Sequence, residues 1–248
     1  MTKRVLITRT PDRAAKLLDL LRKDGIDSFA VPVTRVVHIA DNAIPELDDY
    51  NWLAFTSANG VKTFGDALKK YGGFLPVTTK IASIGSVTAK EIKRVLKAPD
   101  IVAENADGLT LAGEILETSN DPGELSVLWP CAEKSLLDFP DRLKKAGANI
   151  DRWVCYRVEP IDSKTLLTEL KSTAPWDIVL YAAPSAVRAF SDAWSERDEF
   201  TALAIGQTTL KELKKSGFSD TALSRGVSNR DCAKTINEIL DKRNVESS

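Results

Sequence analysis

The sequence predicts an α/β protein of two similar domains, each a parallel sheet flanked by helices, joined by a two-stranded extended linker. Short apolar or β-branched runs alternate with amphipathic helical patterns along the chain, as they do in parallel βαβ sheets. Several segments also recur once, 121 to 126 residues later, so each half of the 248-residue chain repeats one architecture.

Six short apolar runs are expected to form buried strands. They span residues 5–8, 53–56, 81–84, 127–129, 178–181 and 203–205. Helix starts are expected at Thr10, which precedes Pro11 as a cap, and at Ser163. Apolar side chains at i, i+3 and i+7 predict a buried helix face in each half, formed by Val61, Phe64 and Leu68 and by Val187, Phe190 and Trp194.

The recurrence is clearest in three pairs of segments. These are 52–64 with 178–190, 82–92 with 203–213, and 5–25 with 127–147. Three similar shifts in chain order indicate one duplication, because the repeat units of solenoid proteins are far shorter.

Two segments interrupt the alternation of strands and helices. Residues 31–37 and 153–159 match each other and are expected to be extended crossings between the domains. The first βα unit would then join the C-terminal part of the chain. Domain 1 is expected to comprise 1–33 plus 160–248, and domain 2 is expected to be the inserted segment 36–155.

Composition excludes several classes of function. The 34 basic and 35 acidic residues nearly balance, so no global field favours nucleic acid or an anionic membrane. The three cysteines are scattered and odd in number, which argues against a disulfide framework or a cysteine-based zinc site. The start of the chain has no signal-peptide core and no apolar run reaches membrane-spanning length, so a cytoplasmic location is expected.

Common catalytic and nucleotide-binding signatures are also missing. His38 is the only histidine, and its extended apolar surroundings favour a hydrogen-bonded structural role over one in a catalytic triad. The chain has no Gly-x-Gly-x-x-Gly and no Walker-type sequence. Dinucleotides and triphosphates are therefore not the expected ligands.

Four turns between a strand and a helix are rich in small or hydroxyl residues: 56–60, 85–88, 183–185 and 206–209. Turns at the carboxyl ends of parallel strands present free amides that can bind a carboxylate or phosphate. Each turn alone could simply cap its helix, and 88–91 and 209–212 have the form of capping boxes. Four such turns on two facing domains would line a cleft for an anionic ligand.

Single residues could add to this chemistry. Tyr156, on the second crossing, could donate a proton as a general acid, or it could be a half-buried strand tyrosine. Arg9, directly after the first strand, could bind a carboxylate through two hydrogen bonds, or it could be a solvated surface arginine. The lysine pairs at 69–70 and 214–215 are expected on the solvent-exposed faces of helices.

The ordered set of these motifs resembles the uroporphyrinogen-III synthase family over nearly the whole chain. That family has an early strand ending in Thr-Arg, a Thr-Ser-Ala/Pro-Asn/Ser-x-Val turn in both domains, an Ile-Gly-x-x-Thr turn twice, and a Val-Tyr segment in the crossing. The corresponding residues here are Thr8-Arg9, 56–61, 184–187, 84–88, 205–209 and Tyr156.

The resemblance implies a lyase of porphyrin and heme biosynthesis that needs no metal or organic cofactor. Its substrate would be hydroxymethylbilane, a linear tetrapyrrole with eight carboxylates, cyclised with loss of water and inversion of the last ring. Tyr156 matches the tyrosine proposed to assist the leaving hydroxyl. The expected substrate-binding residues are Arg9, Thr56, Ser57, Asn59, Gly85, Ser86, Thr88, Lys134, Ser185, Gly206, Thr208 and Thr209.

Two departures from the family pattern affect these expected contacts. Ala182 and Ala183 stand where the family often has Thr-Ser, so one turn loses two hydroxyls. The segment 131–134 ends in Lys134 where the family commonly carries Gly and Arg. A lysine would act as a point charge and could not bind a carboxylate in the bidentate way that an arginine does.

Two other functions are also compatible with the two-domain plan. A cytoplasmic two-domain protein that closes around an anionic small molecule without chemistry would carry similar motifs. A glycosyltransferase-like enzyme shares the two-domain plan, but no feature of the sequence indicates a sugar nucleotide. A monomer is expected, because two domains in one chain already supply a cleft. Binding to nucleic acid or membrane is not expected, because the charges balance.

Overall fold

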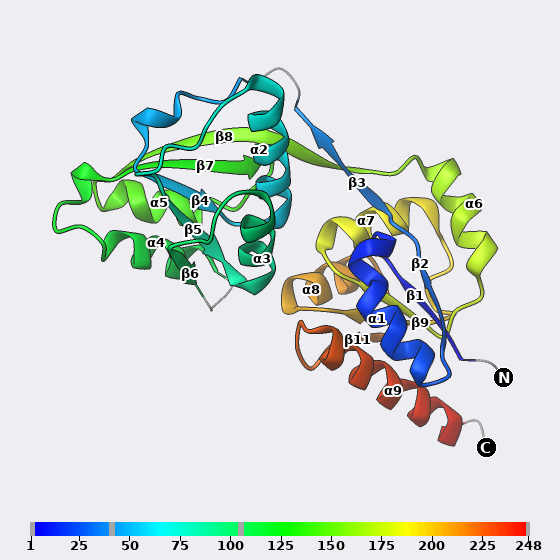
Figure 1. Ribbon diagram of the computed structural model, residues 1–248. Helices are drawn as coiled ribbons and strands as arrows, with labels where there is room; N and C mark the ends of the chain where they lie inside the picture. Colours follow the sequence, from blue (N-terminus) through cyan, green and yellow to red (C-terminus); the bar gives the residue numbers. More distant parts are fainter. Residues whose placement is uncertain (1–2, 40–42, 104–106, 247–248) are drawn as a thin grey trace. The chain divides into compact units, whose positions relative to one another are not determined.

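In the computed structural model, residues 3–39, 43–103 and 107–246 are described (Figure 1). The chain divides into two compact units: unit 1 comprises Met1–Arg35 and Glu159–Ser248, and unit 2 comprises Val36–Val158. The domains expected from the sequence also contain positions 1–2, 40–42, 104–106 and 247–248, which lie outside the described residues. Each unit is a mainly parallel sheet flanked by helices, which confirms the predicted fold class.

Unit 1 is built on a five-stranded parallel sheet. Its strands, in spatial order, are β11 (Thr221–Leu223), β10 (Thr201–Ala204), β9 (Ile178–Tyr181), β1 (Arg4–Ile7) and β2 (Asp27–Ala30). Two helices bury one face, α1 (Pro11–Lys23) and α9 (Asn229–Glu246). Three cover the other face, α6 (Ser163–Thr173), α7 (Pro184–Ala193) and α8 (Gln207–Lys215).

Unit 2 is built on a six-stranded sheet. Its strands, in spatial order, are β3 (Thr34–His38), β8 (Asn149–Pro160), β7 (Ser126–Ala132), β4 (Trp52–Phe55), β5 (Lys80–Ile84) and β6 (Ile101–Ala103). Helices α4 (Gly108–Leu116) and α5 (Asp138–Lys145) cover one face, and α2 (Ala58–Tyr71) and α3 (Gly85–Val95) cover the other (Figure 1). Short 3-10 turns form at Leu47–Asp49 and Pro122–Glu124.

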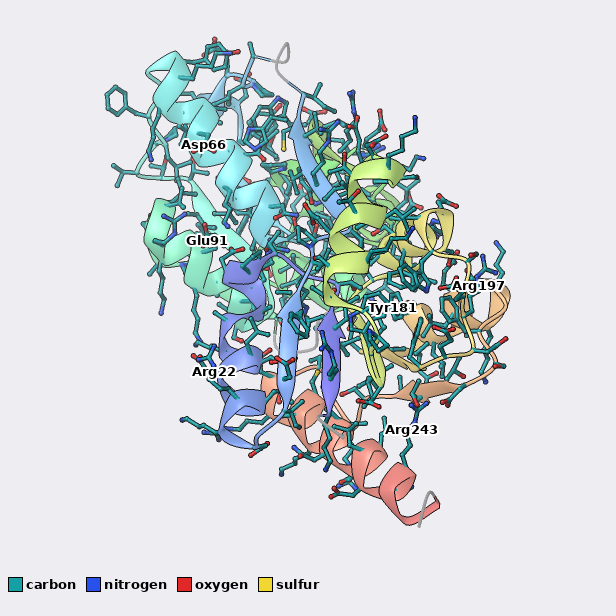
Figure 2. All side chains as sticks on the ribbon, turned by 90° about the vertical axis from the view of Figure 1, so that its right-hand side faces the viewer. Arg22, Asp66, Glu91, Tyr181, Arg197 and Arg243 are labelled. Atoms are coloured by element: carbon teal, nitrogen blue, oxygen red, sulfur yellow. The ribbon has the colours of Figure 1, made fainter. Side chains whose placement is uncertain are left out.

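Helices α2 and α3 carry charged side chains. Figure 2 shows Asp66 on α2 and Glu91 on the neighbouring α3, with Glu91 in an ion pair to Arg94 of its own helix at 2.6 Å. Lys69 and Lys70 of α2 are exposed, as are Lys214 and Lys215 of α8. These lysine pairs therefore lie on solvent-exposed helix faces, as the sequence predicts.

The two sheets share one strand order. The order β2-β1-β9-β10-β11 of unit 1 corresponds to β8-β7-β4-β5-β6 of unit 2, where β3 adds an edge strand beside β8. In each sheet the chain winds outward in both directions from a switch point, which lies between β1 and β9 in unit 1 and between β7 and β4 in unit 2. The carboxyl ends of the strands at such a point are where doubly wound sheets bind ligands.

The six predicted strands are all present, with ends shifted by up to three residues. Val61, Phe64, Val187 and Phe190 are fully buried, as their helical spacing predicts. Helix α1 begins at Pro11 with Thr10 as the cap residue. Helix α6 begins at Ser163, but the capping side chain is Asp162, which accepts from the Thr165 amide.

One local prediction is wrong. Thr88 and Thr209 do not cap helices, because α3 begins at Gly85 and α8 at Gln207, so both threonines lie inside their helices and are buried. His38, at the end of β3, is exposed, and within the described residues no hydrogen bond to its ring is found. Positions 40–42, close to His38 in the chain, lie outside the described residues, so its hydrogen-bonded role stays a prediction.

Candidate active site

A hydrogen bond between two side chains spans the switch point of unit 2. Thr56 and Ser57 follow β4 directly, and Trp129 lies on β7 next to it. The Trp129 indole Nε1 donates to Thr56 Oγ1 at 3.1 Å. Trp129 is itself buried edge-on against Phe139 of α5. The threonine after β4 is thereby held at the carboxyl edge of the sheet.

Ser57 caps helix α2. Its Oγ accepts a hydrogen bond from the Gly60 amide at 3.1 Å, which satisfies one of the free amides of the first turn. A Cβ at Gly60 would lie 2.8 Å from the Pro130 carbonyl oxygen, so only glycine lets this turn pack directly against β7. The start of α2 is fixed between β4 and β7, with Asn59 half-buried in its first turn.

Tyr156 reaches the same turn from β8. Its hydroxyl lies 2.8 Å from Ser57 Oγ, and only 5 % of the residue is exposed. Cys131 pairs with Val154 and Ala132 with Tyr156, so β8 carries one extra residue, Cys155, at this point. Such a bulge redirects the side chain that follows it, which here is the tyrosine.

The cysteines beside this tyrosine do not provide a nucleophile. Cys155 Sγ donates to the Cys131 carbonyl oxygen at 3.7 Å, and burial raises the pKa of Cys155 to about 12. Burial also raises the pKa of Cys131, although Arg152 opposes that shift. All three cysteines of the chain are free and buried. Because a thiol reacts as its thiolate, these groups are inert at neutral pH.

The other expected site residues of unit 2 lie at the carboxyl edge of the same sheet. Gly85 has a φ of +67°, which lets α3 start directly at the end of β5. Ser86, in the first turn of α3, is exposed, whereas Thr88 is buried. Lys134 is exposed in the loop after β7.

Unit 1 has an equivalent hydrogen bond at its own switch point. Thr8, after β1, donates its hydroxyl to the Leu180 carbonyl oxygen of β9 at 2.9 Å. The next residue, Arg9, is half-buried, and this burial lowers its pKa, with Cys232 and Arg13 as the nearby charge effects. Among the described side chains no ion pair to the Arg9 guanidinium is found. A cation without such a partner is suited to an anionic ligand.

Two further turns of unit 1 begin helices. Ala183 is the cap residue of α7 and offers no side-chain bond, so Ser185, half-buried in the first turn, is the nearest hydroxyl. Gly206 is the cap residue of α8, Thr208 is exposed, and Thr209 is buried. A hydrogen bond therefore joins Ser57 to Tyr156, whereas Thr56, next to Ser57 in the same turn, is bonded to Trp129. Asn59 also lies in that turn, and the remaining expected site residues lie on other turns.

Sequence reasoning missed Trp129 and Gly60, which hold Thr56 and Ser57 in place. The available signal was the third recurrent pair, which aligns Trp129 with Ile7 at the end of the first strand. Two hollows lie elsewhere, one of about 490 Å³ beside α1 and α9 and one of about 480 Å³ lined by residues of 43–48 and 68–76. Neither is lined by an expected site residue.

Comparison with known proteins decides the family. The family model described as uroporphyrinogen-III synthase HemD matches residues 15–232, which is most of the chain. The chain belongs to the uroporphyrinogen-III synthase family.

Two named relatives and one structure agree with this uroporphyrinogen-III synthase assignment. The chain is 23 % identical to the uroporphyrinogen-III synthase of Chlorobaculum parvum, over 96 % of this chain and 99 % of that one. It is 27 % identical to the chloroplastic enzyme of Oryza sativa subsp. japonica, over 86 % of this chain and 73 % of that one. The solved uroporphyrinogen-III synthetase of Helicobacter pylori has the same fold, with a TM-score of 0.69 at 18 % identity, covering 96 % and 100 % of the two chains.

Two searches of the described residues found nothing further. No helix there combines the length and apolar character that a membrane crossing needs. In residues 3–39, 43–103 and 107–246, no three histidine, cysteine, aspartate or glutamate side chains gather as metal ligands.

Proposed function

We propose that this synthase converts hydroxymethylbilane to uroporphyrinogen III and that Tyr156 donates a proton to the hydroxyl group that leaves. The observation that carries the proposal is the 2.8 Å hydrogen bond between Tyr156 and Ser57 at the switch point of unit 2. It joins the phenol matching the family tyrosine to the start of a helix, where parallel sheets bind ligands.

The substrate itself supplies most of what is needed to break the carbon–oxygen bond. The electron-rich pyrrole beside the hydroxymethyl carbon supplies the electrons that expel the hydroxyl, and a proton lets it depart as water. A phenol with an ordinary pKa of about 10 holds its proton at neutral pH and can supply it here. The main task left to the enzyme is to fold and orient a flexible chain.

Ser57 is suited to position the phenol and to stabilise it after proton transfer. Its Oγ already accepts from the Gly60 amide at 3.1 Å, so its own hydroxyl proton can be donated to the Tyr156 oxygen. A hydrogen bond to a developing phenolate is stronger than one to a neutral phenol. In this arrangement the serine acts through the tyrosine.

The carboxylates of the substrate would be bound by the turns that follow the strands. Free amides in the first turn of a helix and the positive end of its dipole both favour an anion. The proposed contacts are Arg9, Thr56, Asn59, Gly85, Ser86, Lys134, Ser185, Gly206 and Thr208. Thr88 and Thr209 are left out because their side chains are buried inside helices.

A turnover experiment separates this proposal from a binding protein without chemistry. Purified protein is mixed with a large molar excess of freshly made hydroxymethylbilane, and the loss of the bilane is compared with its spontaneous cyclisation. A synthase consumes the whole excess faster than the spontaneous reaction does. Protection of one equivalent of bilane, with the rest cyclising at the spontaneous rate, would contradict the proposal.

We also propose that the protein is a cytoplasmic monomer. Three free, buried cysteines fit a reducing compartment. The rice relative is named as chloroplastic, so cell fractionation is the needed test. Light scattering should give a mass near 27.1 kDa, and twice that value would overturn the monomer.

A further inference from the structure

The described residues expose three leucines strongly, and all three lie at one edge of unit 2. They are Leu109, Leu136 and Leu137, with 47 %, 82 % and 46 % of each residue exposed. We call them the leucine rim. Large apolar side chains gathered on a surface indicate something that covers them.

A close backbone contact brings the rim together. Leu109 lies in the first turn of α4, and Leu136 and Leu137 lie just before α5. A Cβ at Gly108 would lie 2.9 Å from the Phe139 Cβ, so the first turns of α4 and α5 touch. Figure 1 shows these two helices side by side on one face of the sheet.

The rim lies at the edge of the sheet that carries the candidate active site. Leu109 follows β6, and Leu136 and Leu137 follow β7, whereas Thr56 follows β4. These strands belong to one parallel set, so their carboxyl ends share an edge. An apolar surface and the hydroxyl-rich turn that begins α2 therefore lie at the same carboxyl edge of the sheet.

The duplication places a different side chain at the position that matches Leu109. Leu109 is the second residue of the helix after the last strand of its sheet, and the second residue of the matching helix in unit 1 is Arg230. Arg230 is also exposed. The same place in the same architecture thus carries an aliphatic side chain in one unit and a cation in the other.

We infer that the leucine rim binds the pyrrole rings of the linear tetrapyrrole, while polar turns bind its carboxylates. This inference rests on the proposed function, which supplies a ligand whose flat apolar rings alternate with charged side arms. Aliphatic side chains covering such rings gain the free energy of removing both apolar surfaces from water. The rim is a binding surface and takes no part in proton transfer.

The test is the triple variant Leu109→Gln, Leu136→Gln, Leu137→Gln, compared with a triple Leu→Met variant that keeps the surface apolar. The glutamine variant should raise KM for hydroxymethylbilane about tenfold, with kcat and the melting temperature unchanged. The methionine variant should stay within about twofold of the parent in KM.

A matched control lies at the opposite edge of the same sheet. Phe74 and Val77, before β5, are 88 % and 94 % exposed, and the variant Phe74→Gln, Val77→Thr should leave KM unchanged.

Four results would contradict the inference or the function on which it rests. If the unsubstituted protein is active and the glutamine variant has the same KM, the leucine rim does not bind the pyrrole rings. The same conclusion follows if KM rises equally in the control variant. If the rim substitutions halve the mass measured by light scattering, the rim is an interface between copies of the chain, and the proposal is overturned. If the unsubstituted protein makes no uroporphyrinogen III, the proposed function itself is overturned.

Discussion

The Tyr156 hydroxyl lies 2.8 Å from Ser57 Oγ, although the two residues are 99 positions apart in the chain. Ser57 is fixed by the Gly60 amide, and Tyr156 is directed by the bulge at Cys155. The helix cap and the strand irregularity therefore meet in one hydrogen bond. This bond ties the proposed acid to the turn that begins α2.

Removing the phenol hydroxyl tests the proposed acid. Tyr156→Phe should lower kcat by about 100-fold, the lower end of what general acids contribute, with KM nearly unchanged. The lost hydrogen bond should cost about 1 kcal/mol of stability. Tyr50→Phe is the control, because that hydroxyl also bonds a side chain of unit 2, Asp151 at 2.9 Å, but lies outside the proposed site. Equal kcat in the two variants would remove Tyr156 from the mechanism.

Ser57→Ala should affect both stability and rate. The lost cap should cost about 1 kcal/mol, visible as a lower melting temperature. The rate should fall less than in Tyr156→Phe, and the double variant should be no slower than Tyr156→Phe alone, because the serine acts through the tyrosine. Asp162→Ala removes the cap of α6 and should change stability only. Fully additive losses in the double variant would contradict a shared role.

Arg9 should contribute to binding and reduce stability. Burial lowers its pKa, which means that the folded protein disfavours the charged form. Arg9→Met should therefore raise KM about tenfold while the melting temperature stays equal or rises. Arg22→Met is the matched control, since Arg22 lies on the exposed face of α1 and pairs with Asp19 at 3.0 Å (Figure 2). An unchanged KM in the Arg9 variant would exclude a carboxylate contact.

Acid should selectively weaken two helix caps. The Thr110 amide and hydroxyl lower the pKa of Asp107, and those of Thr165 lower the pKa of Asp162, both from 3.8. Carboxyls with a lowered folded-state pKa stabilise the fold above the unfolded value and lose that effect as pH falls through the folded value. The melting-temperature gap between the parent and an Asp107→Ala, Asp162→Ala variant should be full near pH 6 and shrink below about pH 3.8. A gap of constant size throughout would show that the charges are irrelevant.

The sequence predicts the layers of this fold well because they depend on local patterns. Apolar runs locate the strands, and helical spacing locates buried residues such as Val61 and Phe190. The capping boxes fail for a geometric reason. With φ of +67° at Gly85, helix α3 starts directly at the end of β5, so Thr88 falls inside the helix.

The candidate site is only partly predictable. Tyr156, Thr56 and Ser57 can be picked out individually, because their types and places suit the chemistry. The contact between Tyr156 and Ser57 depends on the register between β7 and β8 and on one extra residue in β8, and sequence spacing determines neither. The Trp129 bond to Thr56 is likewise a contact across strands that no local pattern encodes.

The most direct test of the central claim is the identity of the product. Purified protein receives freshly generated hydroxymethylbilane, the products are oxidised, and the type I and type III isomers are separated by chromatography. The account predicts type III in excess over the type I isomer that forms spontaneously. Type I alone, at the spontaneous rate, would contradict it.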